Sequence, residues 1–339
     1  MPNDTTSYTL DSREATDVAE LSLALSRSYR SFDDPELLRD LPTLAAELPR
    51  NVQRHLREFQ LADRRGFTAI RGHHFDQERI GPTPEHWRGR ERPGPEFPEE
   101  ILLLLYSALL GEPFGWATQQ DGHLVHDIFP IRAHEDDQLG MGSKELLTWH
   151  TEDAFHPYRS DYLILGALRN PDHVPTTVGE LDLSFLSKED IDQLFEPQFY
   201  IAPDESHLPK NNSVASQEEM NRFATILRIV EERRPVALLY GSRQDPYMRV
   251  DPYFMDLPDD PDACRAYEAL CKVIDAGMQE AVAEQGDFLV IDNHRAVHGR
   301  LPFKARYDGT DRWLKRACVT TDLRRSRELR ATADVRLLG

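Results

Sequence analysis

The chain has 339 residues, and its 59 acidic side chains outnumber its 40 Lys and Arg, which gives a formal net charge of −19. Hydrophobic residues make up 40% of the sequence, which is ordinary for a globular protein with a substantial core. So acidic a surface disfavours binding to nucleic-acid phosphates or to an anionic membrane. No segment approaches the ~20 consecutive apolar residues of a membrane span, and no secretory leader is visible at the start. Three sparse cysteines are typical of reduced thiols, so we expect a cytoplasmic protein.

The first part of the chain is predicted to be helical. Asp11 and Glu14 form a capping-box pattern ahead of apolar residues at helical spacing. Asp34 and Pro35 are a typical N-cap and first helical residue. Helices are predicted from residue 12, from residue 35, over 50–62 and over 99–110, with a short strand at 67–72 and a long loop at 73–97. We therefore expect an N-terminal helical region over about residues 10–65.

The rest of the chain is predicted to consist mainly of strands. These are expected at residues 125–131, 146–150, 162–169, 198–202, 236–240, 247–250, 288–292 and 313–321. Two helices, 188–195 and 262–284, interrupt them. Many strands at irregular intervals are typical of a jelly roll, so we expect one mainly β domain spanning 1–339 with its core over about 110–322. The polar stretch 204–222 is expected to form a lid.

A candidate metal site is suggested by a His-x-Glu triplet. The sequence contains three His-x-Asp/Glu triplets, at 74–76, 134–136 and 150–152, and its 13 His and 59 acids would give roughly two by chance. Only the third follows an apolar strand. Positions i and i+2 of an extended segment face the same side, so His150 and Glu152 would converge. With one distant His, such a pair makes the facial triad of non-haem Fe(II) oxygenases.

The strand predicted near the C-terminus carries two arginines on an apolar face. Arg312, Leu314 and Arg316 alternate along it and so point to the same side. Buried arginines need anionic partners. Carboxylates of bound ligands would supply them, or Asp308 and Asp311 would do so on a solvated face. The spacing leaves both readings open.

Four segments, in this order, resemble the clavaminate-synthase-like Fe(II)/2-oxoglutarate oxygenases. They are GWATQQDG at 115–122, HTEDAF at 150–155, DNHRAVHGR at 292–300 and RYDGTDRWLKR at 306–316. The resemblance extends over most of the chain from about residue 10, and it is to the branch of free-amino-acid hydroxylases typified by the viomycin-pathway arginine β-hydroxylase and the enduracididine hydroxylases. It implies a double-stranded β-helix core with helical additions, and Fe(II), 2-oxoglutarate and O₂ as cofactor and cosubstrates.

The resemblance also implies which residues hold the metal and the cosubstrate. His150, Glu152 and His298 match the iron ligands of the family. Arg312 matches the residue that binds the distal carboxylate of 2-oxoglutarate, and Thr177 is implied as a second contact to this cosubstrate.

The amino-acid substrate is implied to bind beside these groups. Arg316 matches the residue that holds its α-carboxylate, with Gln119 and Glu152 near its α-amino group. Asp204 and Ser206 match lid residues that close over it.

The far end of the substrate is implied to meet Asp251. The viomycin-type enzyme has a second acid two residues later, where this chain has Tyr253, so a grip on guanidinium by two carboxylates is not expected. A plain structural reading is that Asp251 caps a turn and Tyr253 packs with Phe254.

The implied reaction is hydroxylation, at the β-carbon, of a free L-amino acid with a guanidino side chain, arginine or an enduracididine-like residue, in natural-product biosynthesis. Four alternatives are left open: desaturation, another substrate such as lysine, ornithine, asparagine or citrulline, a zinc hydrolase, and a non-catalytic cupin-like binding protein. A small amino acid is the expected partner, a homodimer is compatible with the pattern, and nucleic acid and membrane are not expected.

Overall fold

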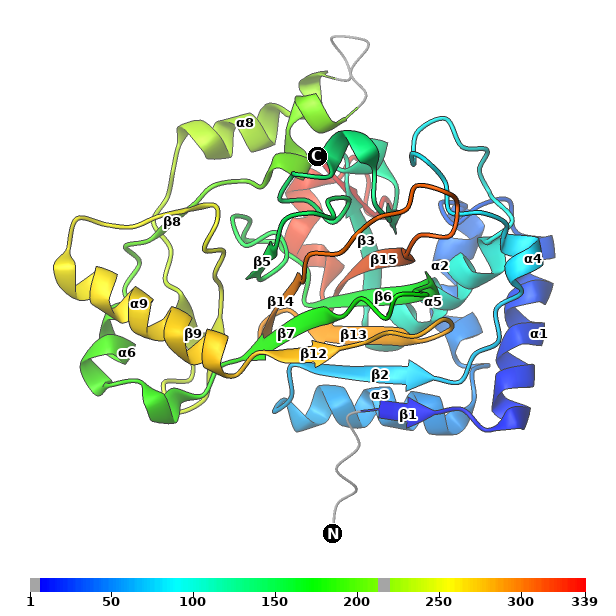
Figure 1. Ribbon diagram of the computed structural model, residues 1–339, viewed down its shortest axis with the longest axis horizontal. Coiled ribbons are helices and arrows are strands. Elements are labelled where there is room, and N and C mark those ends of the chain that lie inside the picture. Colours follow the sequence, from blue (N-terminus) through cyan, green and yellow to red (C-terminus); the bar gives the residue numbers. More distant parts are fainter. Residues whose placement is uncertain (1–6, 213–219) are drawn as a thin grey trace.

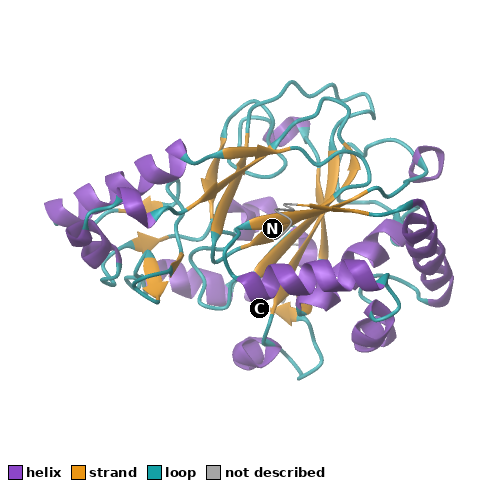
Figure 2. Ribbon diagram, turned by 90° about the horizontal axis from the view of Figure 1, so that it is seen from below, coloured by secondary structure: helices purple, strands orange, loops and turns teal. Residues whose placement is uncertain are grey.

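The computed structural model describes residues 7–212 and 220–339. Its centre consists of two β-sheets that face each other, with helices packed on their outer sides (Figures 1 and 2). This is the double-stranded β-helix with helical additions that the sequence predicts. Residues 213–219, which belong to the expected lid, lie outside the described residues. No helix in the described ranges is both long and apolar enough to cross a membrane.

The N-terminal helices begin where the sequence places their caps. The Asp11 side chain accepts a hydrogen bond from the Glu14 backbone N–H at 2.9 Å, and the Glu14 side chain accepts one from the Asp11 N–H at 3.1 Å. The helices of this region are α1 (Ser12–Ser28), α2 (Pro35–Ala45), α3 (Arg50–Ala62), the short α4 (Gln77–Ile80) and α5 (Phe97–Leu110). The long loop predicted at 73–97 therefore contains one helical turn.

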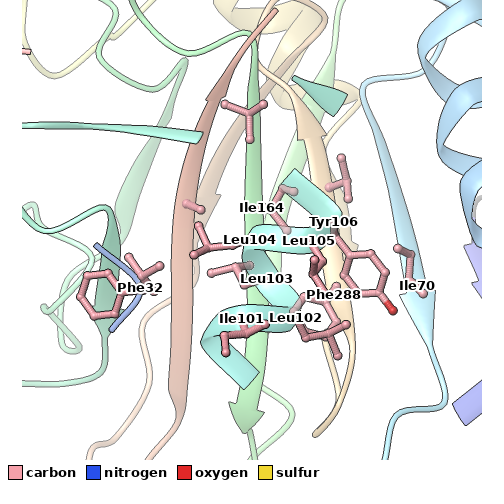
Figure 3. Close-up of a cluster of buried hydrophobic side chains, with 14 of the residues drawn as sticks. Phe32, Ile70, Ile101, Leu102, Leu103, Leu104, Leu105, Tyr106, Ile164 and Phe288 are labelled. Carbon is pink, nitrogen blue, oxygen red and sulfur yellow. The ribbon is translucent and has the colours of Figure 1, made fainter. Parts of the chain in front are cut away.

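Helix α5 is largely apolar around its circumference after Glu99 and Glu100, as is typical of a helix that is almost entirely buried. It lies between the other N-terminal helices and the larger sheet, and Leu103 and Tyr106 are completely buried there. Figure 3 shows these side chains beside Ile164 and Phe288 of the sheet. The main hydrophobic core therefore lies between α5 and the sheet, away from the interior of the β-helix.

The larger sheet contains eight strands among the described residues. In order they are β1 (Ser7–Thr9), β2 (Phe67–Arg71), β13 (Phe288–Asp292), β6 (Tyr162–Arg169), β15 (Trp313–Thr320), β3 (Glu112–Trp116) and β16 (Leu337–Leu338), with β4 (Val125–Ile128) also paired to β15. Strand β6 is buried on both faces. Ile164 and Leu168 pack against the helices, whereas Leu163 and Leu165 face the smaller sheet.

The smaller sheet carries the other wall of the β-helix. Its order is β12 (Gln279–Ala281), β7 (Thr176–Glu180), β14 (Ala296–Arg300) and β5 (Leu147–His150). Its outer face packs on α9 (Pro261–Ala276) and α6 (Lys188–Leu194), where Val297 meets Leu270 and Ile274. Outside it lie the pairs β8 (Tyr200–Ile201) with β11 (Met255–Asp256) and β9 (Leu239–Gly241) with β10 (Pro246–Met248). Helix α8 (Ala224–Glu231) lies beside Trp116 of β3 and Leu338 of β16.

The structure departs from the predicted elements in this smaller sheet. The helix predicted over 262–284 ends at Ala276, with Gly277 as its C-cap, and 279–281 form strand β12 instead. Strands β7 and β14 were not predicted. Both are short, and pairing with neighbours distant in the sequence holds them in extended form.

Candidate active site

The three residues expected to bind metal converge at one edge of the smaller sheet. Strands β5 and β14 pair antiparallel, with His150 opposite His298, and Glu152 follows β5 two residues after His150. The Glu152 Oε2 atom lies 4.0 Å from His150 Nε2 and 3.3 Å from His298 Nε2. All three side chains line a cavity between the two sheets.

The donor atoms are oriented for a metal ion. His150 Nδ1 donates a hydrogen bond to the Thr148 carbonyl at 2.8 Å, which leaves the Nε2 lone pair free to face Glu152. Glu152 Oε1 accepts a hydrogen bond from Arg316, and Oε2 is buried with no hydrogen-bond partner among the described residues. Two imidazole nitrogens and one unpaired carboxylate oxygen fit the facial triad of non-haem Fe(II) enzymes.

The charges in the cavity favour the metal-binding form of two of these ligands. Burial raises the pKa of Glu152, but the Arg316 guanidinium and the two imidazoles outweigh it and hold this pKa below its usual value. Burial also lowers the pKa of His298. An ionised carboxylate and a neutral imidazole are the forms that coordinate metals. For His150, burial acts in the same direction, but Asp251 and Glu152 outweigh it and raise the pKa.

Other histidines near the motifs lie outside this group. His294 Nε2 is hydrogen-bonded to Asp161 at 2.7 Å, and in the second triplet His134 Nδ1 pairs with Asp137 at 2.8 Å. Among the described residues, the metal-type cluster at this edge consists of the three expected side chains alone. Context, rather than the triplet pattern, was thus the informative signal.

The two arginines of β15 point into the cavity, as their alternation predicts. Arg312, Leu314 and Arg316 line it. The reading in which neighbouring aspartates neutralise them is wrong for both candidates: Asp311 accepts the backbone N–H groups of residues 306 and 307, and Asp308 accepts from Thr310. Arg316 pairs instead with Glu152, and Arg312 has no ion-pair partner among the described residues, so Arg312 presents its positive charge to the cavity.

Arg312 forms a cationic end of the cavity. It is 6% exposed, and its Nη2 donates to Thr176 Oγ1 at 3.4 Å. Burial lowers the pKa of Arg312 to about 9, and the nearby guanidinium of Arg300, which also lines the cavity, acts in the same direction. Neither arginine has an acidic partner among the described residues, so this end suits a ligand carboxylate.

Thr177 is not at this end of the cavity, which corrects the expectation. Strand β7 pairs with β14 so that Thr176 is opposite Arg300 and Thr177 is opposite Gly299. Side chains alternate along a strand, so Thr176 faces the cavity and Thr177 lies on the other face, over Gly299. The strand was not predicted, and without it the two threonines could not be told apart.

Arg316 links the metal edge to the expected lid. Its Nη1 donates to Glu152, and its Nη2 donates to Gln119 Oε1 at 3.3 Å. Gln119 Nε2 donates in turn to Ser206 Oγ at 2.7 Å. Asp204 accepts the Ser206 backbone N–H at 2.8 Å, and all five side chains line the cavity. The substrate residues implied by the resemblance are thus brought together.

The turn containing Ser206 is held by a buried ion pair. His207 Nε2 lies 2.8 Å from Asp153 Oδ1, and His207 Nδ1 is hydrogen-bonded to Thr118 Oγ1, also at 2.8 Å. Trp116 Nε1 donates to the second oxygen of Asp153 at 2.6 Å. Burial lowers the pKa of His207, but Asp204 and Asp153 outweigh it and raise this pKa, as expected for the charged partner of an ion pair. The segment at 205–207 is therefore tied to the residue next to Glu152.

Asp251 lines the cavity beyond His150. Its carboxylate accepts the backbone N–H groups of Tyr253 and Phe254 at 3.2 and 3.3 Å, so it does cap a turn. The rings of Tyr253 and Phe254 pack edge to face, but Tyr253 is 56% exposed at the rim and lies outside the core. Burial raises the pKa of Asp251 to about 6. A cation placed here would lower it again.

His126 and Arg300 are charged or polar cavity residues to which the sequence assigns no role. His126 lies on β4 opposite Arg316, and Arg300 follows His298 by two residues on β14. The strand containing His126 was predicted, and alternation would have placed this side chain on the same face as Ile128. Only the register with β15 turns that face toward the cavity.

Comparisons with known proteins agree with this geometry. A family model described as "Taurine catabolism dioxygenase TauD, TfdA family" matches residues 188–318. An L-ornithine/L-arginine 3-hydroxylase of Catenulispora acidiphila is 45% identical over 332 residues, 95% of this chain and 96% of that protein. An enduracididine beta-hydroxylase of Streptomyces hygroscopicus is 41% identical over 323 residues, 93% and 94% of the two chains.

Solved structures are similar over the whole fold. The crystal structure of the non-heme iron oxygenase OrfP with Fe, succinate and (3S)-hydroxy-L-Arg matches with a TM-score of 0.97 and 77% identity, over 98% of this chain and 99% of that chain. The structure of OrfP with Fe and alpha-ketoglutaric acid matches with a TM-score of 0.91 and 73% identity, over 99% and 100%.

Proposed function

The chain belongs to the TauD/TfdA family of dioxygenases, and from this premise we propose that it hydroxylates the β-carbon of free L-arginine, using Fe(II), 2-oxoglutarate and O₂. One observation carries the proposal. A single cavity combines the two-histidine, one-carboxylate group with a cationic end at Arg312 and a carboxylate at Asp251. The similarity to OrfP, solved with Fe, succinate and a hydroxylated arginine, supports the same chemistry.

Each end of the cavity has a distinct role in this proposal. His150, Glu152 and His298 hold the iron. Arg312, with Thr176 beside it, binds the distal carboxylate of 2-oxoglutarate, since a guanidinium and a hydroxyl both donate to carboxylate oxygens. When bound, the iron and its cosubstrate supply the oxidising power that places an oxygen atom on an unactivated carbon.

The amino acid is held at both of its charged ends. Arg316 binds the α-carboxylate, and the oxygens of Gln119 and Glu152 are acceptors for the α-ammonium. Asp204 and Asp251 face the cationic side chain. Fixing the two ends sets which carbon faces the metal edge, and positioning of this kind is what the protein contributes to the reaction.

The segment at Asp204–His207 is proposed to close the cavity over the substrate. Ser206 bonds to Gln119, and His207 to Asp153, so closure is tied to the residues around the α-carbon. By keeping water away from the metal edge, this segment would limit the consumption of 2-oxoglutarate in the absence of the amino acid.

The test is a binding titration without oxygen, followed by analysis of the products. The protein loaded with Fe(II) and 2-oxoglutarate is titrated with L-arginine, L-ornithine, L-lysine, L-asparagine and L-citrulline, and O₂ is then admitted. We expect the tightest binding and a gain of one oxygen with L-arginine. A product that has lost two hydrogens would indicate desaturation, and binding without succinate release would contradict an oxygenase.

A further inference from the structure

Asn293 is a completely buried amide to which the proposed function assigns no role. It lies in the turn between β13 and β14 that leads to His298. Its Oδ1 accepts the Glu152 backbone N–H at 2.7 Å, and its Nδ2 donates to the Glu152 carbonyl at 3.0 Å. One side chain therefore holds both polar backbone groups of an expected metal ligand.

Glu152 needs such partners because it lies beyond the end of the sheet. Strand β5 ends at His150, so its ladder of hydrogen bonds does not extend to Glu152. The next residue, Asp153, has a φ of 51°, in the left-handed region, so the chain turns directly after the ligand. Backbone groups in such a turn take their partners from side chains. Asn293 thus fixes the peptide groups on both sides of the Glu152 Cα, and with them the direction in which its side chain leaves the backbone.

The same residue connects Glu152 to the sheets of the β-helix. Asn293 Nδ2 also donates to the Ser160 carbonyl at 2.9 Å, and the Asn293 backbone N–H donates to the Asp161 carbonyl at 2.9 Å. Ser160 and Asp161 immediately precede β6, a strand in the middle of the larger sheet. Beyond Asn293 the chain continues into β14, which carries His298. Glu152 is therefore anchored both to the larger sheet and to the segment that supplies the distal histidine.

Arg316 is the reason that this anchoring matters for metal binding. One carboxylate oxygen of Glu152 accepts from Arg316, and the other, which faces the two histidines, has no hydrogen-bond partner among the described residues. A guanidinium can bind both oxygens of a carboxylate side by side, so a Glu152 that could shift would turn its second oxygen toward Arg316 as well. Resting on the proposed iron site, we propose that Asn293 is a positioning residue, which holds the Glu152 backbone so that one carboxylate oxygen stays available to the metal.

Asn170 offers a matched control for this role. It is buried, its Oδ1 accepts the Val174 backbone N–H at 3.0 Å, and its Nδ2 donates to the carbonyls of Val174 and Ala283 at 3.0 and 2.9 Å. The pattern of hydrogen bonds is the same as at Asn293, but Asn170 follows the opposite end of β6 and none of these partners is an expected metal ligand. Removing either amide leaves buried backbone groups unpaired, so both changes should lower the stability, whereas only one should affect the metal.

The test measures metal binding without turnover. Mn(II) alone is titrated into the metal-free wild type, Asn293→Ala and Asn170→Ala, and the free ion is followed by its EPR signal. We expect Asn293→Ala to bind Mn(II) about 10–100-fold more weakly than wild type, the scale of lost support behind a metal ligand, and Asn170→Ala to bind it as wild type does. An unchanged affinity in Asn293→Ala, or equal losses in the two variants, would overturn the proposal.

A second variant keeps the test decisive if Asn293→Ala folds poorly. Asn293→Ser leaves room for a water molecule beside its hydroxyl, so it should lose less stability. In the metal-free protein we expect the Glu152 amide of this variant to exchange its hydrogen faster than in wild type, the amides of β6 to exchange as in wild type, and the Mn(II) affinity to fall as in Asn293→Ala. Faster exchange throughout β6 would indicate a general loosening of the fold and would overturn a local role for Asn293.

His298→Ala separates the failure of this inference from the failure of the proposed function. Because a metal ligand is removed, we expect this variant to lose Mn(II) binding. Wild-type affinity in His298→Ala, or no Mn(II) binding by the wild-type protein, would contradict the proposed iron site itself, and the role of Asn293 with it. Loss of binding in His298→Ala with wild-type affinity in Asn293→Ala would contradict the role of Asn293 alone.

Discussion

Glu152 contacts Arg316 through one carboxylate oxygen and faces the metal-binding histidines with the other. One oxygen accepts from Arg316, and the other is unpaired between His150 and His298. Arg316 thereby keeps this buried carboxyl ionised, against the effect of burial. Arg316, which is expected to hold the substrate carboxylate, thus also keeps the metal ligand Glu152 in its ionised form.

The distal metal ligand is the first residue to test. His298→Ala should lose bound Fe(II) and turnover, since a metal ligand is removed and a change even in groups that support a ligand costs about 10–100-fold in metal affinity. His294→Ala should keep its iron, because His294 is bonded to Asp161 and stands apart from the triad. Iron content and the visible band of the iron–2-oxoglutarate complex measure metal binding in both variants. Normal iron content in His298→Ala, with loss in His294→Ala, would reverse the assignment.

Asp251 predicts a pH dependence of substrate affinity. Burial raises its pKa to about 6, and only its ionised form attracts a cationic side chain. As the pH falls through 6 the carboxyl becomes protonated, so kcat/KM for L-arginine should fall about tenfold per pH unit below that point. Asp251→Asn should lower kcat/KM about 10–100-fold at pH 7.5, the scale of a lost charged hydrogen bond, and remove this limb of the profile.

Asp292 offers a matched control for this titration. Burial also raises its pKa to about 6, but it accepts the His294 N–H at 2.9 Å and does not line the cavity. Asp292→Asn should therefore keep the wild-type profile. If the limb near pH 6 vanished in Asp292→Asn and persisted in Asp251→Asn, the side-chain pocket would lie elsewhere.

At the scale of elements, strand β15 is the part of the fold on which the site depends most. Its inner face presents Arg312 and Arg316 to the cavity, and its outer face carries Lys315 toward α5. The buried Lys315 ammonium contacts Glu96, Glu100 and Asp127 at 2.6–2.9 Å. The position of the strand is therefore fixed by charge on one side while it offers charge to ligands on the other.

Replacing Arg312 and Arg316 by alanine should weaken the binding of two different ligands. Arg312→Ala should raise the 2-oxoglutarate requirement by about tenfold or more and leave the dissociation constant of L-arginine nearly unchanged, because a charge-assisted contact to the cosubstrate is lost. Arg316→Ala should chiefly weaken the amino acid. Calorimetric titration of each ligand in each variant checks this. Equal losses for both ligands in both variants would mean that the arginines act as one structural unit.

The ion pairs of Lys315 on the outer face of β15 predict an effect on the stability of the fold. Lys315→Met leaves Glu100 without a cation and leaves Glu96 and Asp127 with Arg90 and Arg92 alone. Because an uncompensated buried charge remains, the free energy of unfolding should fall by about 3–5 kcal/mol. Lys144→Met is the control, because Lys144 is exposed and pairs with Glu135 on the surface, where solvent screens the ion pair and it contributes little to stability. Urea denaturation measures both. A loss below about 1 kcal/mol for Lys315→Met would show that the buried cluster does not stabilise the fold.

At the scale of the whole molecule, elements with local signals were predictable from the sequence. The capping pattern at Asp11 locates α1, and helical spacing predicts α3 over the residues that form it. The long strand β6 was likewise predicted, since its burial on both faces requires a continuous hydrophobic run. Strand β15 was predicted although Lys315 and Arg316 interrupt its apolar residues. Four motifs then identified the family and brought His150 and Glu152 together with a distant histidine.

The remaining features depend on pairing between distant segments. Strands β7 and β14 are short and have weak local signals, so Thr176 and Thr177 could not be assigned to opposite faces without the register. His126 had a predicted strand, but only pairing with β15 places it against Arg316. The helix predicted over 262–284 stops early because 279–281 pair with β7.

The most direct test of the account is the fate of molecular oxygen during turnover. The iron-loaded protein is supplied with ¹⁸O₂, 2-oxoglutarate and L-arginine, and the products are analysed by mass spectrometry and NMR. We expect one ¹⁸O atom in succinate and one on the β-carbon of arginine for each 2-oxoglutarate consumed. Succinate formed with arginine unchanged, or arginine oxidised at another carbon, would contradict it.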